Sequence, residues 1–314
     1  YQDINFGNIF LDPVRGDICI CDNDNVDING ERGGVFGTKK FMAPEIVRGE
    51  KRPDANTDLY SLAILLFYIL HNWHALDGRR EAELKFLDND SEVALYGTAP
   101  LFMFDPGDPS NGPVEGLHEA VVLSWRSLTD EVRELFVRSF SSGISAPMSH
   151  RVMEGEWRGA MVHLRDAIAR CPSCGHEQAA AGNAFVPPGG AACLVCGEAL
   201  DTRLHLDLGG DSVLMGRGTS LTRHHLVAPG SFEVVHAVAS VEPHPHPGRR
   251  AGAAQRHHGH LERAPARRQD RGRTADEDGP PRRGAGDRLR SLPGAGRMPV
   301  IQEAAAGPLS LIHI

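Results

Sequence analysis

The chain has 314 residues, of which 41% are hydrophobic and 24% charged, a composition typical of a soluble globular protein with two or three domains. The formal net charge of −8 argues against nucleic acid as the main partner, because binding to phosphates needs a basic surface. The longest apolar run, residues 62–70, is shorter than the roughly 20 residues that span a bilayer. No signal peptide is recognisable, so we expect a cytoplasmic protein with no membrane partner.

The first polar residues that could take part in catalysis or metal binding lie at the start of the chain. Asp3 is followed five residues later by Asn8, which leads into an apolar run that contains Phe10. A second β-like run ends at Cys21, and Asp22 comes directly after it. Carboxylates and amides of this kind can accept a hydroxyl proton and bind Mg²⁺, as phosphoryl transfer requires. Taken one by one, the same residues are also typical of turns and helix caps.

A Gly-rich polar loop follows and ends at Thr38, seven residues before the Glu45 of Ala-Pro-Glu. Asp58 then opens an apolar helix, and Arg151 precedes Glu-Trp further along the chain. This order resembles the C-terminal lobe of bacterial Ser/Thr-type protein kinases, whose motifs are H-R-D-x-x-x-x-N, D-F-G, G-T-x-x-Y-M-A-P-E and D-x-W/Y-S-L. The resemblance covers about half of the chain, up to residue 168.

The resemblance implies a role for each matching residue near the reacting groups. Asp3 is expected to be the catalytic base that accepts the proton of the substrate hydroxyl. Asn8 and Asp22 are expected to bind Mg²⁺ as hard oxygen ligands. Thr38 is expected to orient Asp3 and to help seat the acceptor residue. The implied cofactors are ATP and Mg²⁺.

Other matching residues are expected to have structural or nucleotide-binding roles. The resemblance implies that Glu45 pairs with Arg151 and that Asp58 bonds the backbone of the catalytic loop. It also implies that Phe10 and Cys21 form part of the floor of the adenine pocket. For Cys21, a small buried core residue is an equally good interpretation.

Several positions depart from the family pattern. Gln2 replaces the Arg that usually pairs with a phosphate on the activation loop, and residues 23–36 contain no Ser, Thr or Tyr. We therefore expect no switching by phosphorylation of this loop. Asn5 replaces the Lys that contacts the γ-phosphate, and Asn23 and Asp24 replace the Phe and Gly of D-F-G.

The glycine-rich loop and the strand lysine of the nucleotide-binding lobe do not occur in the sequence, and we expect them to precede Tyr1 in a parent protein. The chain alone is expected neither to bind ATP tightly nor to transfer phosphate, whereas the parent would phosphorylate protein Ser/Thr hydroxyls. A phosphatase partner is implied by a resemblance to stress-response kinases. The alternative is a pseudokinase-like scaffold that recruits partners.

Two C-x-x-C-Gly turns predict a metal site. Their four thiolates, from Cys171, Cys174, Cys193 and Cys196, form a closed set with no position left for a catalytic water. We expect a structural Zn²⁺ ribbon whose folding depends on the metal. His176 is surplus to the set and is expected on the surface.

Residues 203–247 alternate apolar and polar side chains and predict short strands. Arg217, Ser220 and His224 loosely resemble the phosphothreonine-binding residues of a forkhead-associated sandwich. The alternative is an unrelated β module with surface histidines.

The expected fold class is therefore α+β, in four parts. These are a mainly helical kinase C-terminal lobe (1–168), a zinc ribbon (169–200), a partial β-rich module (203–247) and a tail (248–314). The Arg/Gly/Ala/Pro-rich tail is expected to be either disordered or the product of a shifted reading frame.

Overall fold

The computed structural model contains two compact units, Tyr1–Leu200 and Asp201–Ile314. The described residues are 1, 3–12, 17–21, 26, 37–185, 191–200, 202, 204–207, 212–215, 219–226, 237–242, 252–257, 260–262 and 300–303. Helices and small sheets are mixed, and the segment expected to be a zinc ribbon lies in the same unit as the helices.

The first unit begins with a β-hairpin. A 3-10 turn, η1 (Phe6–Asn8), leads into β1 (Ile9–Leu11), which pairs with β2 (Ile18–Ile20) in antiparallel register. Both apolar runs near the start of the chain are thus confirmed as strands. Cys21 N donates to Asn8 O at 2.8 Å, so the pairing carries on to the residue before Asp22.

The central element is α2 (Ala55–His71), which contains the longest apolar run. Its start is fixed by a capping box, in which Asp54 accepts from Thr57 N at 2.9 Å and Thr57 Oγ1 accepts from Asp54 N at 2.8 Å. Its end is set by Asn72 in the left-handed conformation, with φ 51°. The buried residues of α2 recur at helical spacing, so the helix packs on several sides.

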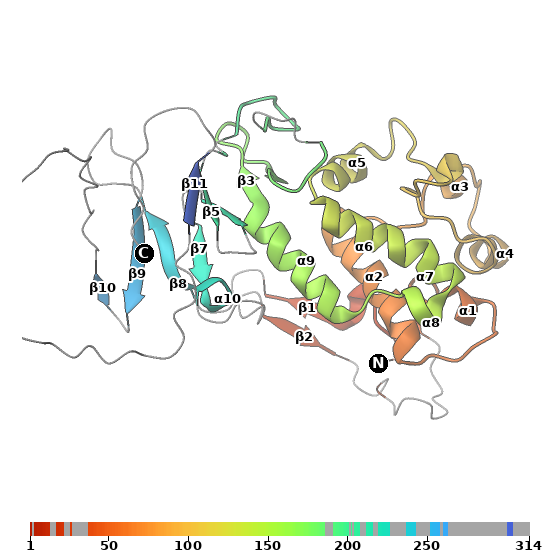
Figure 1. Ribbon diagram of the computed structural model, residues 1–314. Coiled ribbons are helices and arrows are strands. Elements are labelled where there is room, and N and C mark those ends of the chain that lie inside the picture. The colour runs from red at the N-terminus through yellow and green to blue at the C-terminus, as the bar shows by residue number, and fades with distance from the viewer. Residues whose placement is uncertain are drawn as a thin grey trace, which may run out of the picture. The chain divides into compact units, whose positions relative to one another are not determined.

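The core forms where α2 meets the later helices (Figure 1). These are α5 (Glu119–Arg126), α6 (Asp130–Phe140) and α9 (Glu154–Ala167). Helix α6 contacts both α2 and α9. The rings of Phe67 on α2 and Phe136 on α6 pack edge to face, with their centroids 5.3 Å apart. Aromatic side chains therefore hold these helices together by burial and ring-edge contacts.

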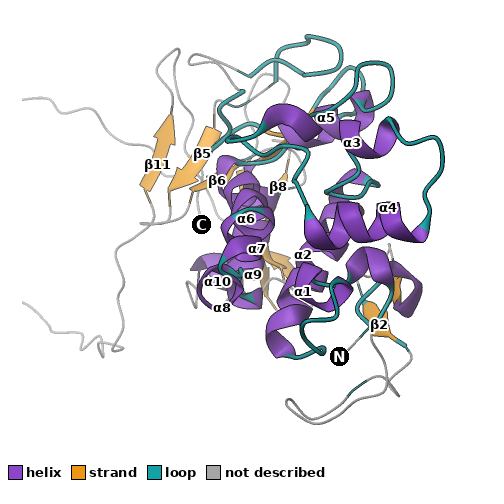
Figure 2. Ribbon diagram, turned by 90° about the vertical axis from the view of Figure 1, so that its right-hand side faces the viewer, coloured by secondary structure: helices purple, strands orange, loops and turns teal. Residues whose placement is uncertain are grey.

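Short elements connect and surround these helices. The turn after α4 contacts α1, and Figure 2 shows them at the same end of the unit. The connecting elements are η3 (Lys39–Phe41), α1 (Pro44–Val47), α3 (Arg79–Ala82), α4 (Asn89–Val93), the π-helical turn η4 (Ala94–Thr98), η5 (Pro109–Asn111), α7 (Ser142–Ser145) and α8 (Pro147–His150). Across the described residues, every helix falls short of the length and hydropathy needed to cross a membrane.

A second hairpin continues directly from α9. Its strands are β3 (Ile168–Arg170) and β4 (Glu177–Ala179), paired antiparallel, and the turn between them carries Cys171 and Cys174. Ala180 N donates to Ala167 O at 2.8 Å, which ties the hairpin to the end of α9.

The second unit consists of two antiparallel sheets, with strand orders β11-β5-β6 and β10-β9-β8-β7. Its elements are β5 (Leu204–Asp207), β6 (Ser212–Leu214), β7 (Ser220–Thr222), α10 (Arg223–Leu226), β8 (Ala237–Glu242), β9 (Gly252–His257), β10 (His260–Glu262) and β11 (Val300–Glu303). The short strands expected at 203–247 are present. The strand expected around Phe232 and Val234 lies outside the described residues.

The expectation of a structureless tail after residue 248 does not hold for three short segments, because β9, β10 and β11 are strands. Strand β9 pairs with β8, and β11 pairs with β5. Composition argued against a packed core in this segment. Backbone N–H and C=O groups can pair in a ladder whatever side chains they carry, so composition alone does not exclude strands.

Candidate functional site

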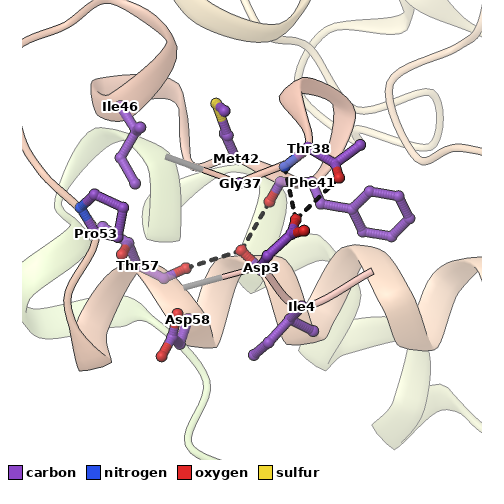
Figure 3. Close-up of a pocket in the computed structure, with 11 residues that line it drawn as sticks. Asp3, Ile4, Gly37, Thr38, Phe41, Met42, Ile46, Pro53, Thr57 and Asp58 are labelled. Carbon is purple, nitrogen blue, oxygen red and sulfur yellow. Dashed lines mark hydrogen bonds between the residues drawn. The ribbon is translucent and has the colours of Figure 1, made fainter. Parts of the chain in front are cut away.

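The carboxylate of Asp3 lies against the end of the Gly-rich loop. Thr38 donates to Asp3 Oδ1 twice, from its backbone N at 2.8 Å and from Oγ1 at 2.9 Å (Figure 3). These two residues are 35 positions apart, so the contact joins two separate segments of the chain. Two donors on one oxygen fix the carboxylate and leave Oδ2 to interact with other groups.

Asn8 lies on the other side of the same carboxylate. Its Nδ2 is 3.2 Å from Asp3 Oδ2 and 3.1 Å from Asp3 O. Since the amide nitrogen faces Asp3, the amide oxygen of Asn8 is turned away from it and remains able to accept a cation. The structure thus brings Asp3, Asn8 and Thr38 together. Asp22 lies outside the described residues.

This donor set fits magnesium as far as it is described. Mg²⁺ prefers hard oxygen ligands, and the cluster offers the amide oxygen of Asn8 beside a carboxylate. Asn8 would bind the ion together with Asp22. The bound ion would neutralise charge on the phosphates, and Asp3 would hold the proton of the acceptor hydroxyl.

Asn5 is a site residue that the family pattern did not reveal. It is only 8% exposed, and its Nδ2 donates to Asp3 O and to Thr38 Oγ1, both at 3.2 Å. Its Oδ1 accepts from Gly7 N at 2.7 Å. Asn5 therefore connects the segment that carries Asp3 to Thr38, and it stands at the position where the resemblance implies a lysine. Because Asn at this position is not part of the kinase motif, the sequence alone did not predict that Asn5 bridges Asp3 and Thr38.

The two residues expected at the floor of an adenine pocket share one face of the first hairpin. Phe10 lies opposite Cys19 in the antiparallel register, and Cys21 follows two residues later, so all three side chains point to the same side. The Sγ atoms of Cys19 and Cys21 are 4.0 Å apart. Phe10 is 60% exposed and Cys21 is half-buried, so this face is open in the described structure.

A buried ion pair supports the loop after Thr38. Arg151 Nη2 donates to Glu45 Oε1 at 2.6 Å, and the side chains are 2% and 11% exposed. Arg151 Nη1 also reaches Asn56 O at 2.8 Å, and its guanidinium lies 5.7 Å from the Tyr60 ring. The long side chain thus joins the loop to the start of α2.

Asp58 lies one turn into α2 and faces the first residue of the segment that carries Asp3. The backbone nitrogen of Tyr1 donates to Asp58 Oδ2 at 2.9 Å. Burial raises the pKa of Asp58 above its usual value, so the donor offsets part of the cost of burying the carboxylate.

Figure 3 shows a pocket beside Asp3 with a cavity volume of about 10 Å³. Sites for small molecules usually measure roughly 300–1,000 Å³, so this pocket by itself is far too small for a nucleotide. It is bounded by the segment that carries Asp3, by the Thr38 segment and by the start of α2. Its lining residues are Asp3, Ile4, Gly37, Thr38, Phe41, Met42, Ile46, Pro53, Thr57, Asp58 and Ser61.

The four cysteines of the paired turns meet at one point. Their sulfur atoms all lie within 4.8 Å of one another, with 3.5 Å between Cys171 and Cys196 and between Cys174 and Cys193. A tetrahedral zinc with Zn–S bonds of about 2.3 Å places its sulfur ligands about 3.8 Å apart. The observed spacing therefore fits a closed four-thiolate site.

The two turns have the same backbone geometry. Gly175 N donates to Cys171 O at 3.0 Å with φ 76° at the glycine, and Gly197 N donates to Cys193 O at 2.9 Å with φ 75°. Both positions need glycine because that φ is left-handed. The backbone N–H of Cys174 lowers the pKa of Cys171 to about 7, which favours the thiolate that binds metal.

Gln178 holds the two turns together, and no motif in the sequence marked it. It is 1% exposed, its Nε2 donates to Ala192 O at 3.1 Å, and its Oε1 accepts from Leu194 N at 2.7 Å. The side chain thus links the β3–β4 hairpin to the second C-x-x-C turn.

The ribbon is docked on the corner between α5 and α6. His176 was expected on the surface, but it is half-buried, and its Nε2 lies 3.1 Å from Ser127 Oγ. Ala179 N donates to Ser127 O at 2.7 Å, and Asn183 Nδ2 donates to Arg126 O at 2.8 Å. Sequence could not show this docking because each contact spans dozens of residues.

The structure describes only part of the set that resembles phosphothreonine-binding residues. Ser220 is exposed, His224 is 1% exposed, and Arg217 lies outside the described residues. The expectation of surface histidines does not hold for His224 and His225, because His225 is 3% exposed and its Nδ1 accepts from Thr222 N at 2.9 Å.

Comparison with known proteins gives a partial match. No family profile matches the chain. A stretch of 77 residues is 32% identical to the serine/threonine-protein kinase sck2 of Schizosaccharomyces pombe, covering 23% of this chain and 12% of that kinase. The kinase PK-1 of the Cydia pomonella granulovirus aligns over 48% of both chains with 18% identity and a TM-score of 0.27, too low to establish a common fold. Part of the chain is therefore similar in sequence to a serine/threonine kinase.

Proposed function

We propose that this chain forms the acceptor-side half of a protein Ser/Thr kinase site, in which Asp3 is the base that takes the proton of the substrate hydroxyl. The observation that carries the proposal is the position of the Asp3 carboxylate, held by Thr38 on one oxygen and by Asn8 on the other. A general base needs a fixed orientation and one oxygen within reach of the acceptor.

In this proposal the metal ligands are the amide oxygen of Asn8 and the carboxylate of Asp22. ATP supplies the phosphoryl group, and Mg²⁺ neutralises its charge as it is transferred. Thr38 keeps Asp3 in place and borders the pocket where the acceptor residue would lie. The acceptor is a Ser or Thr of a protein substrate, and a phosphatase is the proposed opposing partner.

The exposed apolar side chains of the first hairpin, β1–β2, support the proposal that another chain segment completes the site. Phe10, Leu11, Ile18 and Ile20 are all between 52% and 65% exposed. A two-stranded hairpin that is apolar on both faces is stabilised when other chain segments cover it. We propose that a nucleotide-binding lobe covers this hairpin, and that the chain alone does not turn over ATP.

The test is phosphoryl transfer by a protein that contains this chain together with its nucleotide-binding half. Asp3→Asn is expected to lower the transfer rate by about 100-fold or more, the usual effect of removing a general base. Asp90→Asn, an exposed position on α4, is the matched control and should retain activity. Transfer that is undiminished in Asp3→Asn would refute Asp3 as the base, and no transfer by the unsubstituted protein would favour the alternative, a scaffold that recruits partners.

A further inference from the structure

The segment after Thr38 is held in place by two lysines that the family pattern does not explain. We name residues 37–43 the acceptor loop. Lys39 Nζ donates to Asn89 Oδ1 at 2.8 Å and to Glu92 Oε2 at 2.6 Å, both on α4. Lys40 Nζ donates to Asp77 Oδ2 at 2.8 Å. Two successive side chains therefore tie the loop to separate parts of the fold.

The Lys40 contact is made to a buried acceptor. The side chain of Asp77 is 9% exposed, and its other oxygen, Oδ1, accepts from Tyr96 Oη at 2.7 Å. Tyr96 is 1% exposed, and its ring centroid lies 5.4 Å from Lys40 Nζ. Burial alone would raise the pKa of Asp77, but donors from His74 and Lys40 outweigh it and hold the pKa well below its usual range.

The backbone of Lys40 is held as well as its side chain. His74 Nε2 lies 2.9 Å from Lys40 O, and His74 is 2% exposed. Trp73 Nε1 donates to Asp77 O at 2.7 Å, which fixes the turn that carries Asp77. Lys40 thus contacts the same turn at two points, and a buried charge pair of this kind tolerates little displacement.

The turn η3 connects the fixed position of Lys40 to Thr38 through backbone hydrogen bonds. Phe41 N donates to Thr38 O at 2.8 Å, and Met42 N donates to Lys39 O at 3.1 Å. Because Thr38 and Lys40 belong to the same short hydrogen-bonded turn, a displacement of Lys40 would also displace Thr38. Since Thr38 donates twice to Asp3, the position of Lys40 bears on the position of the proposed base.

We infer that Lys40 and Asp77 are a positioning pair that holds the acceptor loop against Asp3 by a permanent ion pair. This inference rests on the proposed function for its catalytic meaning.

The test is amide hydrogen exchange of the acceptor loop in the chain as it stands. Lys40→Met is expected to speed exchange at the amides of Thr38, Phe41 and Met42 by about tenfold, as expected when a hydrogen bond to a buried charge is lost. Exchange in α6 should not change. Lys40→Arg keeps the positive charge, so the same amides should exchange about as slowly as in the wild type.

The matched control is Lys51→Met. Lys51 pairs with Asp54 at 2.7 Å with 31% of its side chain exposed, against 32% for Lys40, but it lies outside the acceptor loop. It should leave exchange at Thr38 unchanged. If Lys40→Met does not fold, Tyr96→Phe removes only the hydroxyl on Asp77 and should speed loop exchange by a few-fold.

Unchanged exchange at Thr38 in a folded Lys40→Met protein would overturn the inference. Faster exchange throughout α6 as well as in the loop would also overturn it, because the pair would then serve only global stability. Exchange does not require catalysis. Undiminished transfer by Asp3→Asn in the protein that contains both halves, together with the local exchange effect, would therefore refute the proposed function and leave the positioning pair intact.

Discussion

Arg151 and Glu45 lie 106 residues apart in sequence, and their side chains form an ion pair of 2.6 Å in the interior of the first unit. The pair joins the end of the acceptor loop to the segment that precedes α9. Because Arg151 also donates to Asn56, its removal would leave the buried Glu45 carboxylate and two half-buried oxygens of Asn56 without this donor.

Arg151→Met is therefore expected to destabilise the chain by about 3 kcal/mol, because Glu45 would remain as an uncompensated buried charge. The free energy of unfolding can be measured by urea denaturation. Lys51→Met breaks a pair whose side chains are 31% and 28% exposed, and it should cost no more than about 1 kcal/mol. A loss in Arg151→Met as small as in this control would show that the buried pair is unimportant.

His71 is predicted to make the chain sensitive to acid. Burial lowers its pKa from 6.5 to about 3, and its Nδ1 lies 2.7 Å from Ser124 Oγ. The unfolded chain takes up a proton near pH 6.5 while the folded chain does not, so stability falls as pH drops from 6.5 toward 3. The expected loss between pH 6.5 and 4.5 is about 2 kcal/mol from this residue.

The check is the free energy of unfolding of the wild type and of His71→Leu at pH 6.5 and 4.5. The variant cannot protonate here, so its stability should fall less over this interval than that of the wild type. Parallel losses in the two proteins would contradict the assignment of His71 as a buried neutral side chain.

The four-cysteine cluster is predicted to bind one zinc ion per chain. Cys193→Ser should abolish stoichiometric zinc in the purified protein, because a closed site needs all four thiolates. Cys19→Ser changes an exposed thiol outside the cluster and should retain the metal. Zinc content can be measured by mass spectrometry. Equal zinc in the two variants would exclude the cluster as the site.

Gln178 is predicted to matter for zinc affinity although it is not a ligand. Gln178→Ala removes the bridge between the two turns and should weaken zinc binding by about tenfold, as is typical for residues that orient metal ligands. Glu177→Ala, at the neighbouring exposed position, is the control. Competition with a chelator measures both affinities, and equal values would refute the role of Gln178.

The sequence predicted the features that short-range geometry determines. The C-x-x-C-Gly turns, the spacing from Asp3 to Asn8 and the apolar helix after Asp58 each depend on a few neighbouring residues. It did not predict the contacts of Lys40 with Asp77 or of His176 with Ser127. These join residues 37 and 49 positions apart, and only the folded chain brings them together.

The tail shows the opposite error. Its Arg/Gly/Ala/Pro-rich composition predicted disorder or a shifted reading frame, yet residues 252–257 form β9, which pairs with β8. Composition reports on burial, whereas strand pairing also depends on which backbone groups lie side by side. Sequence patterns are therefore weakest where hydrogen bonding between distant segments decides the structure.

The proposed magnesium site is tested most directly by measuring where on the chain a divalent ion binds. Mn²⁺ can replace Mg²⁺ on oxygen ligands and broadens nearby NMR signals. Titration of the chain with Mn²⁺ is predicted to broaden the side-chain amide of Asn8 before that of Asn89, which lies on α4. Asp22→Ala should remove this preference. Equal broadening of the two amides, or a preference that survives Asp22→Ala, would contradict a shared magnesium site.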